Sequence, residues 1–363
     1  MKKAYLVLAD GTVFEAYRFG YEADAIGELV FTTGMEGYIE TLTDPSYAGQ
    51  IVIQTFPLIG NYGVIQDDFE GDSFLKGYIV REYCDTPSNF RCDMTLDSYL
   101  KEKKIPGLYG IDTRELTRII REHGVINAGI FDEVPEDLAA VRQYAVSGVV
   151  AETSCKESYV AKSTTGHTDY RVTLIDYGAK RNIVRELISR DCEVKVVPYN
   201  TSAEEILNDH PDGIMLSNGP GDPKENTESI AQLKKIIGQV PVFGICLGHQ
   251  LTALSQGGDT FKMKYGHRGL NQPVTDLHNG RTFITTQNHG YAVNAESLRG
   301  KGEQAFVNAN DGTCEGMYYP DLNCLTVQFH PEACAGPKDT EFLFNRFLEM
   351  MKGGTNAKRS QHS

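Results

Sequence analysis

The sequence predicts an α/β fold with two domains: a C-terminal doubly wound, mostly parallel sheet preceded by an N-terminal α+β domain. Three observations support this prediction. The chain has 363 residues, which is too long for one average domain. After residue 170, short apolar runs alternate with helix-like segments, as in consecutive βα units. In residues 1–150 that alternation is missing, and strand-like and helix-like segments are mixed.

The N-terminal domain is predicted to span residues 1–150. Apolar or β-branched runs between glycine-containing turns predict strands at 4–8, 12–16, 28–33 and 50–56. Helix signals predict helices at 96–101, 112–123 and 135–144. We expect Asp112 or Thr113 to cap the second helix at its start and Gly124 to end it. The domain contains no recognisable pair of a nucleophile and a base.

A polar stretch without periodicity, residues 151–169, is predicted to link the domains. The C-terminal domain is predicted to span residues 170–352. Its first part alternates strands at 171–176, 193–197, 213–216 and 240–245 with helices at 179–189, 203–209, 225–238 and 247–253. Its second part is predicted to contain strands at 282–286, 304–307, 316–319 and 325–329 and a last helix at 340–351. Chemistry in such sheets lies beyond the carboxyl ends of the strands, so the loops after residues 176, 216 and 245 are candidates for the site. Residues 353–363 are predicted to be a disordered tail.

Charge and composition exclude several classes of protein. With 49 acidic and 35 basic residues, the net charge of −14 argues against binding to nucleic acid or to a membrane surface. No apolar run is long enough for a transmembrane helix or a signal peptide. None of the eight cysteines has C-x-x-C spacing, which argues against a zinc site or a disulfide framework and favours a reducing cytoplasm.

Cys246 is the candidate nucleophile. It stands between the apolar strand that ends at Ile245 and the following helix, with Gly244 and Gly248 on either side. A nucleophile on a sharp strand-to-helix turn needs small neighbours, because a Cβ would collide across the turn. The N-terminus of the helix also favours a thiolate. The alternative is a buried core cysteine between two loop glycines.

His330 is the candidate base, and Glu332 is the candidate residue that orients it. His330 ends the strand 325–329, and Pro331 stops further pairing. Glu332 projects to the same side, as residues i and i+2 do in an extended chain, so it can accept a hydrogen bond from one ring nitrogen. The alternative is an ordinary surface histidine.

A cysteine nucleophile also needs donors for the oxyanion. One donor is the backbone N–H of Leu247, which follows the nucleophile. The loop 217–223 offers Gly219 and Gly221, whose backbone can approach a substrate closely. A phosphate loop is an alternative, but neither of its usual glycine patterns is present, and a plain Pro/Gly turn stays open.

Together these segments resemble the class I, triad-type glutamine amidotransferases: GICLGHQ at 244–250, SNGPGD at 217–222 and HPE at 330–332. The first half is similar to the carbamoyl-phosphate synthase small-subunit family, through GMEGY at 34–38, TDPSY at 43–47, GNYG at 60–63 and GIDTREL at 110–116. QNHGYA at 287–292 is similar to the same family. The resemblance covers the chain up to about residue 352.

The resemblance implies a glutaminase subunit that forms a glutamyl thioester and channels ammonia to a large subunit, which is the ligase that makes carbamoyl phosphate for arginine and pyrimidine synthesis. It implies Cys246 as nucleophile, His330 as base and then acid, and Glu332 as the orienting residue. It places L-glutamine contacts on Ser46, Gly219, Gly221, Leu247, Gln250, Asn288, Gly290 and Tyr291. Ser46 would reach the site from the N-terminal domain, and Tyr291 stands where the family often has Phe. No cofactor or metal is expected on this chain; ATP and Mg²⁺ are expected on the large subunit.

Three alternatives remain open from the sequence. Another class I amidotransferase would share the second half of the chain but not the motifs at 34–63. A stand-alone cysteine hydrolase would not require the N-terminal domain or a partner. A non-catalytic binding protein would not require the cysteine, histidine and glutamate, all of which are present.

Overall fold

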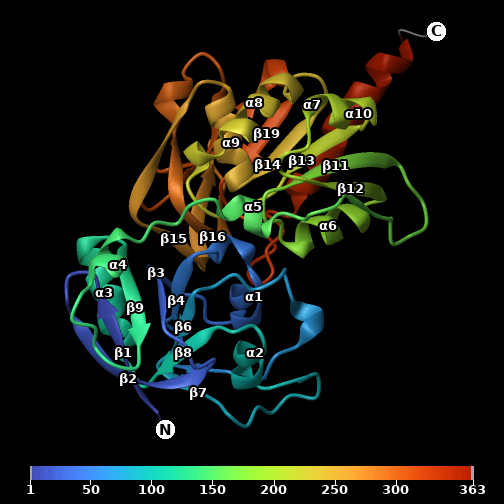
Figure 1. Cartoon of the computed structure of the whole chain (residues 1–363). Helices are drawn as coiled ribbons and strands as arrows, with labels where there is room; N and C mark the ends of the chain where they lie inside the picture. The colour runs from blue at the N-terminus through green and yellow to red at the C-terminus, as the bar shows by residue number, and fades with distance from the viewer. Residues whose placement is uncertain (1, 361–363) are drawn as a thin grey trace. The chain divides into compact units, whose positions relative to one another are not determined.

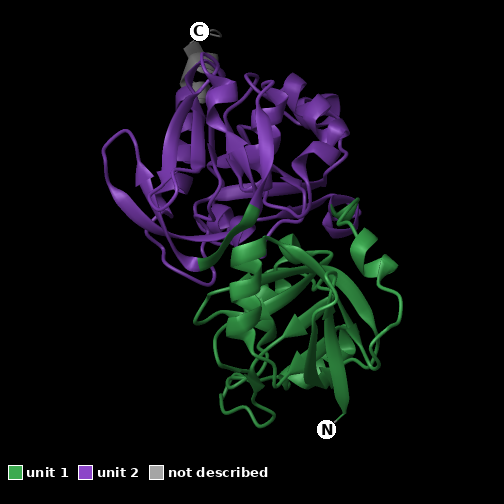
Figure 2. Cartoon of the chain, turned by 90° about the vertical axis from the view of Figure 1, so that its left-hand side faces the viewer, with its two compact units in different colours: residues 1–149, 264–269 green, residues 150–263, 270–363 purple. Residues whose placement is uncertain are grey.

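The computed structural model describes residues 2–360, with only the backbone described for residues 354–360. The chain divides into two compact units (Figures 1 and 2). Unit 1 comprises Met1–Val149 and Lys264–Gly269, and unit 2 comprises Val150–Met263 and Leu270–Ser363. The division after Val149 lies next to the predicted boundary at 150. The grouping of Lys264–Gly269 with unit 1 is not predicted from the sequence.

Unit 1 is built around a closed seven-stranded barrel in the order β1-β2-β8-β6-β4-β3-β9. The strands are β1 (Lys3–Leu8), β2 (Val13–Gly20), β3 (Ala25–Thr32), β4 (Gln50–Gln54), β6 (Gly77–Ile79), β8 (Pro106–Tyr109) and β9 (Ile126–Phe131). All seven contribute to one buried cluster, with alternate residues such as Ile51 and Ile53, and this cluster is therefore the barrel interior. Leu116 and Ile120 of α3 (Thr113–His123) join the same cluster.

A second core lies on the outer side of this barrel. Val30 and Val52, which alternate with the interior positions, pack with Leu42 of α1 (Tyr38–Thr43) and Leu100 of α2 (Leu96–Glu102). Of the two expected caps of α3, Asp112 is the one used: its carboxylate accepts from the N–H groups of Arg114 and Glu115. Two short strands of unit 1 lie outside the barrel: β5 (Leu58–Ile59) and β7 (Glu82–Tyr83) pair with each other.

The sequence missed part of unit 1. β6, β8 and β9 were not predicted, because the first two are only 3 and 4 residues long and each of the three contains a glycine that weakens the strand pattern. The helix predicted at 135–144 is the shorter α4 (Ala139–Gln143). α1 was not predicted either; it has 6 residues and its cap position is a glycine without a capping side chain.

Unit 2 contains a ten-stranded sheet whose centre is parallel. The strands β12 (Cys192–Pro198), β11 (Tyr170–Asp176), β13 (Gly213–Leu216), β14 (Val242–Ile245) and β19 (Cys324–Val327) are parallel neighbours in that order. Beyond β19 the sheet continues with β18 (Cys314–Tyr319), β16 (Thr282–Asn294), β15 (Asp259–Asp276) and β17 (Glu303–Asn308). The antiparallel pairings β18–β19, β16–β18 and β15–β17 explain the β-rich pattern of the sequence.

Helices cover both faces of the parallel part, which confirms the predicted doubly wound fold (Figure 1). One core contains side chains of α7 (Ala203–Asn208), α8 (Thr227–Ile236) and α9 (Leu247–Ser255). The other contains side chains of α6 (Arg181–Ile188) and α10 (Phe342–Ser360). Neighbouring strand residues such as Phe243 and Val242 enter different cores, as the period of a strand requires.

The predicted linker and tail differ from what the structure contains. Residues 151–169 include most of α5 (Val149–Thr153) and all of β10 (Tyr159–Ala161), which pairs antiparallel with β12. β10 is an edge strand of three residues, too short to produce a periodic pattern, and this explains why the segment resembles a linker. α10 extends to Ser360, so residues 353–360 of the predicted disordered tail are helical, and residues 361–363 lie outside the described residues.

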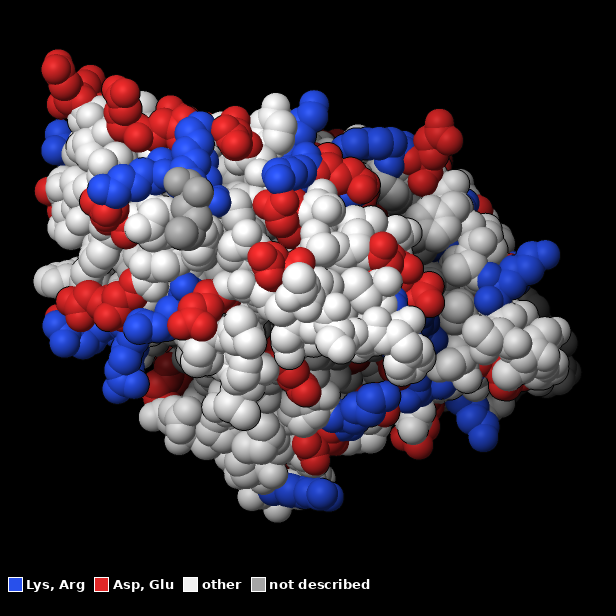
Figure 3. All heavy atoms as spheres, turned by 90° about the horizontal axis from the view of Figure 1, so that it is seen from below, with Lys and Arg blue, Asp and Glu red and all other residues white. Residues whose placement is uncertain are grey.

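Charged side chains of both signs share one face of the molecule. On the face drawn in Figure 3, acidic and basic side chains alternate among uncharged ones. Among the described residues, every helix is too short or too polar to cross a bilayer.

Candidate active site

Cys246 occupies the sharp turn between β14 and α9. Its φ of 52° and ψ of −103° lie outside the regions that side-chain-bearing residues ordinarily adopt. A strained strand-to-helix turn of this kind presents a nucleophile at the end of a strand. The N–H of Cys246 donates to the carbonyl of Val327 at 2.8 Å, which attaches the turn to the neighbouring strand β19.

The two glycines beside Cys246 are explained by close contacts. A Cβ on Gly244 would lie 3.0 Å from Cγ2 of Thr326 on β19 and 3.1 Å from the carbonyl of Gly248 across the turn. A Cβ on Gly248 would lie only 2.6 Å from the carbonyl oxygen of Leu216, so the collision at this position is with β13 instead. Gly248 therefore excludes a side chain unless the backbone shifts, and Gly244 leaves only tight space for one.

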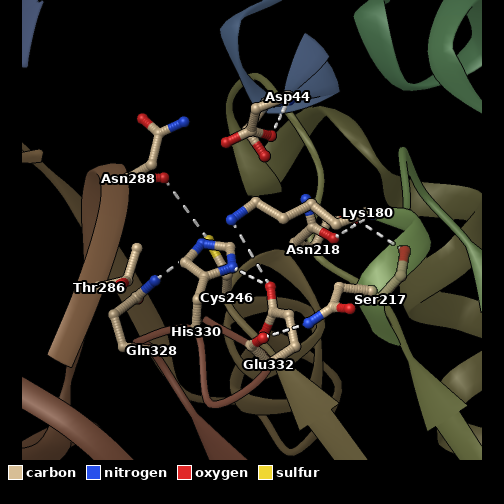
Figure 4. Close-up of polar contacts among 12 residues, drawn as sticks. Asp44, Lys180, Ser217, Asn218, Cys246, Thr286, Asn288, Gln328, His330 and Glu332 are labelled. Atoms are coloured by element: carbon tan, nitrogen blue, oxygen red, sulfur yellow. Dashed lines mark hydrogen bonds and ion pairs between the residues drawn. The ribbon is translucent and has the colours of Figure 1, made fainter. Parts of the chain in front are cut away.

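Cys246, His330 and Glu332 are brought to one edge of the sheet. β14 and β19 are parallel with Ile245 opposite Val327, so the residues that follow both strands lie at the same edge. Nδ1 of His330 lies 2.7 Å from Oε1 of Glu332, and both side chains are fully buried. Nε2 of His330 is the remaining ring nitrogen, and it has no hydrogen-bond partner among the described residues. This arrangement leaves Nε2 available for proton transfer (Figure 4).

A buried lysine, which the sequence analysis did not name, completes the surroundings of Glu332. Nζ of Lys180 lies 3.7 Å from Oε1 of Glu332, and the lysine side chain is only 4% exposed. Burial by itself raises the pKa of the Glu332 carboxyl, but His330 and Lys180 outweigh burial and hold that pKa below its ordinary value. Glu332 is therefore ionised at neutral pH. The helix predicted at 179–189 begins only at Arg181, so Lys180 lies at the end of the loop after residue 176.

The loop after β13 lies against the beginning of α9. A Cβ on Gly219 would lie 2.5 Å from the carbonyl oxygen of Tyr177 and 2.8 Å from Cδ2 of Leu247, so the backbone there packs directly on Leu247. Gly221 has a φ of +85°, which favours glycine. The N–H of Leu247, at the first position of the helix, has no acceptor in a preceding turn. The two backbone segments therefore lie side by side, and their role as oxyanion donors stays a prediction.

The other predicted glutamine contacts fall into two groups. Gln250, on α9, donates its Nε2 to the carbonyl of Tyr291 at 2.8 Å, and the carbonyl of Asn288 lies 3.8 Å from Sγ of Cys246. Asn288 and Tyr291 of β16 therefore lie close to Cys246 and Gln250, and Gly290 lies between them on that strand. The contacts of these residues with glutamine stay predictions. Ser46 belongs to unit 1, where its N–H donates to Asp44, and its contact with glutamine stays a prediction.

The remaining histidines of this region bond to protein groups. Nδ1 of His249 lies 2.8 Å from Oγ1 of Thr326, and burial lowers the pKa of His249 to about 3, so the ring is neutral. His289 pairs through Nδ1 with the carbonyl of Tyr291 and through Nε2 with Gln287. Nε2 of His249 has no partner among the described residues, as in His330, but His249 lacks the carboxylate that contacts Nδ1 of His330, and its lowered pKa makes it a weak base. His330 is therefore the better candidate for the base.

Acidification is expected to destabilise the protein through His249. Its pKa falls from an ordinary 6.5 to about 3 on folding, so between pH 6.5 and about 3 the unfolded chain binds a proton that the folded protein does not. The free energy of unfolding should lose about 1.4 kcal/mol per pH unit in that range from this residue. His249→Asn keeps a polar partner for Thr326 but does not titrate, so denaturant titrations should show a flatter pH dependence. Parallel curves for the two proteins would refute this role.

Two family models match the chain. The model "Glutamine amidotransferase class-I" matches residues 173–350, and "Carbamoyl-phosphate synthase small chain, CPSase domain" matches residues 6–130. The range 6–130 lies within unit 1, and the range 173–350 lies within unit 2 apart from Lys264–Gly269 and contains Cys246, His330 and Glu332.

Similar proteins match the chain over nearly its full length. A carbamoyl phosphate synthase small chain from Oceanobacillus iheyensis is 50% identical over 354 residues, covering 97% of each chain. One from Bacillus cereus is 53% identical over 355 residues, covering 96% of each chain. One from Staphylococcus epidermidis is 51% identical over 358 residues, covering 97% of each. Among solved structures, a glutamine amidotransferase from Thermotoga maritima covers 53% of this chain and 86% of its own, at 17% identity and a TM-score of 0.38.

Proposed function

The chain belongs to the family of carbamoyl phosphate synthase small chains, and on that premise we propose that it releases ammonia from glutamine through a Cys246 thioester and passes it to a large chain. It is a glutamine amidotransferase, the glutamine-hydrolysing component of a synthase. The observation that supports the chemical proposal is the buried pair of His330 and Glu332 at the same sheet edge as the strained turn of Cys246.

The first half of the reaction forms the thioester. The thiol proton of Cys246 passes to Nε2 of His330, and the thiolate attacks the side-chain carbonyl carbon of glutamine. The carbonyl oxygen becomes negatively charged, and the N–H of Leu247 with a second N–H from the loop of Gly219 and Gly221 stabilises it. One such donor is typically worth about 3 kcal/mol of the barrier. His330 then returns its proton to the departing nitrogen, and ammonia leaves.

The second half hydrolyses the thioester. His330 takes a proton from water, the resulting hydroxide adds to the thioester carbonyl, and the thiolate of Cys246 departs as glutamate forms. Glu332 keeps the same ring nitrogen occupied throughout and stabilises the imidazolium, because its carboxyl stays ionised between His330 and Lys180. Because Glu332 occupies Nδ1, Nε2 of His330 can act first as the base and then as the acid.

The proposal assigns the remaining chemistry to the partner. The large chain would bind ATP and Mg²⁺ and combine ammonia with bicarbonate to give carbamoyl phosphate for arginine and pyrimidine synthesis, and this chain would carry no cofactor. Ammonia would pass between the two chains inside the complex. We place the complex in the cytoplasm, in keeping with eight cysteines of which none has C-x-x-C spacing.

Co-purification with the large chain tests the proposal. The isolated two-chain complex should form carbamoyl phosphate from bicarbonate and ATP with either glutamine or ammonia, and glutamate should appear in step with the glutamine-supported product. The large chain alone should use ammonia only. Recovery of an active glutaminase that never binds a large chain would instead favour a stand-alone cysteine hydrolase.

A further inference from the structure

Gln328 is a buried amide that contacts the sulfur of Cys246 and has no part in the mechanism above. It follows β19 directly, and its Nε2 lies 3.5 Å from Sγ of Cys246 (Figure 4). The residue is fully buried, and its backbone N–H donates to the carbonyl of Glu315 on β18 at 2.9 Å. Gln328 and His330 are two residues apart, so the end of one strand directs both towards the site.

The surrounding hydrogen bonds determine which end of the Gln328 amide faces the sulfur. The side chain of Gln250 lies 2.8 Å from the carbonyl oxygen of Tyr291, and a carbonyl can only accept, so the Gln250 atom there must be the nitrogen. That same nitrogen lies 2.9 Å from the amide of Gln328, which must therefore offer its oxygen. The nitrogen of Gln328 is then left to face Cys246.

We propose that Gln328 stabilises the thiolate of Cys246 by donating an N–H to its sulfur, and that Gln250 holds this N–H in position. The inference rests on the proposed function, in which Cys246 is the nucleophile. An N–H donor favours a thiolate over a thiol, because the ionised sulfur is the stronger acceptor. The same contact would stabilise the sulfur again when the thioester breaks and the thiolate departs.

Other groups around the sulfur act alongside Gln328. The carbonyl of Asn288, 3.8 Å from Sγ, can accept only from the thiol and therefore opposes ionisation. His330 is the titratable group at the same sheet edge, with Glu332 and Lys180 behind it. The N-terminus of α9 also favours the thiolate. Gln328 thus adds an uncharged donor whose effect does not depend on the protonation of His330.

The pH dependence of Cys246 alkylation tests the proposal without glutamine. The full-length chain is treated with iodoacetamide across a pH series, and modification is measured in the peptide that contains Cys246. Gln328→Met removes the donor at similar length, and the midpoint of reactivity should rise by about one pH unit, a tenfold loss of thiolate at a given pH. Gln328→Glu also lacks the N–H and adds a negative charge, so its midpoint should rise further.

Matched variants separate this effect from a general loss of structure. Gln54→Met replaces another buried glutamine, whose amide bonds to Gly34 and Tyr78, and should leave the midpoint unchanged. Gln250→Met frees the Gln328 amide to turn, so the midpoint should rise by less than in Gln328→Met. Thermal unfolding of each variant confirms that it is folded.

The results that would overturn the inference are specific. An unchanged midpoint in folded Gln328→Met refutes the donor, and an unchanged midpoint in Gln250→Met refutes the role of Gln250. Failure of the proposed function has a different signature, namely continued glutamine hydrolysis by a Cys246→Ala complex.

Discussion

Replacing Cys246 with alanine is expected to abolish glutamine-dependent carbamoyl phosphate synthesis by the two-chain complex while ammonia-dependent synthesis continues. Without the sulfur no thioester can form, and the loss of a covalent nucleophile typically lowers the rate by about 10⁴- to 10⁶-fold. Alanine keeps a Cβ at the strained turn, so the backbone of β14 and α9 should be preserved. Parallel assays with glutamine and with ammonia as the nitrogen source measure both activities.

Cys192→Ala is the matched control for that experiment. Cys192 is also fully buried in unit 2 and lies in the core between the sheet, α6 and α10. Its replacement should cost some stability and leave glutamine use intact. A Cys246→Ala complex that consumed glutamine at the normal rate would show that another residue is the nucleophile. Co-purification of the variant with the large chain shows whether the complex has assembled, and loss of the ammonia-dependent reaction as well would indicate damage to the large chain.

Replacing Glu332 with glutamine is expected to lower glutamine hydrolysis by about 10³-fold. The amide keeps the size of the side chain but removes the charge that orients His330 and stabilises its imidazolium. It also leaves the buried ammonium of Lys180 without the carboxylate 3.7 Å away, so the variant should unfold at a lower temperature. Ammonia-dependent synthesis should persist. Steady-state kinetics with both nitrogen sources and thermal unfolding measure these effects.

Glu186→Gln serves as the control for Glu332→Gln. Glu186 lies on α6 and pairs with Arg190, away from the three site loops, and its side chain retains 13% exposure. Its replacement should change activity little and stability by about 0.5 kcal/mol. If Glu332→Gln kept more than half of the glutaminase rate, the proposed dependence of His330 on Glu332 would be wrong.

Local patterns predicted elements with clear periodicity or caps well and missed others, among them β15, the 18-residue strand Asp259–Asp276, and most of β16, which was predicted only at 282–286. The strand β11 and the helix α3 have clear hydrophobic periodicity or capping residues, and both lie within two residues of the predicted bounds. β10, β6 and α1 have only 3, 3 and 6 residues, so their formation depends on pairing or packing with segments distant in the sequence. The closed barrel is a property of such pairings, for example between β1 and β9, and no local pattern encodes it.

The residues of the site were also predicted only in part. Cys246, His330 and Glu332 were selected from residue type, neighbouring glycines and position at strand ends, and the structure brings them to one sheet edge. Lys180 and Gln328 were missed. Lys180 fell inside the helix predicted at 179–189, which the structure begins at Arg181, so no loop signal pointed to it. Gln328 was a polar residue two positions before His330 in an apolar strand, but its residue type does not identify its partner.

The sequence alone therefore determined the family, the α/β class and the candidate reacting residues, because these follow from local composition and from motifs a few residues long. Only the tertiary structure decided how those residues are held: which nitrogen of His330 is occupied, which cation offsets Glu332 and which end of Gln328 faces the sulfur. The physical reason is that a buried polar group takes its partners from whatever the parallel pairing of strands places beside it. β14 and β19 are such neighbours, although a long antiparallel segment separates them along the chain.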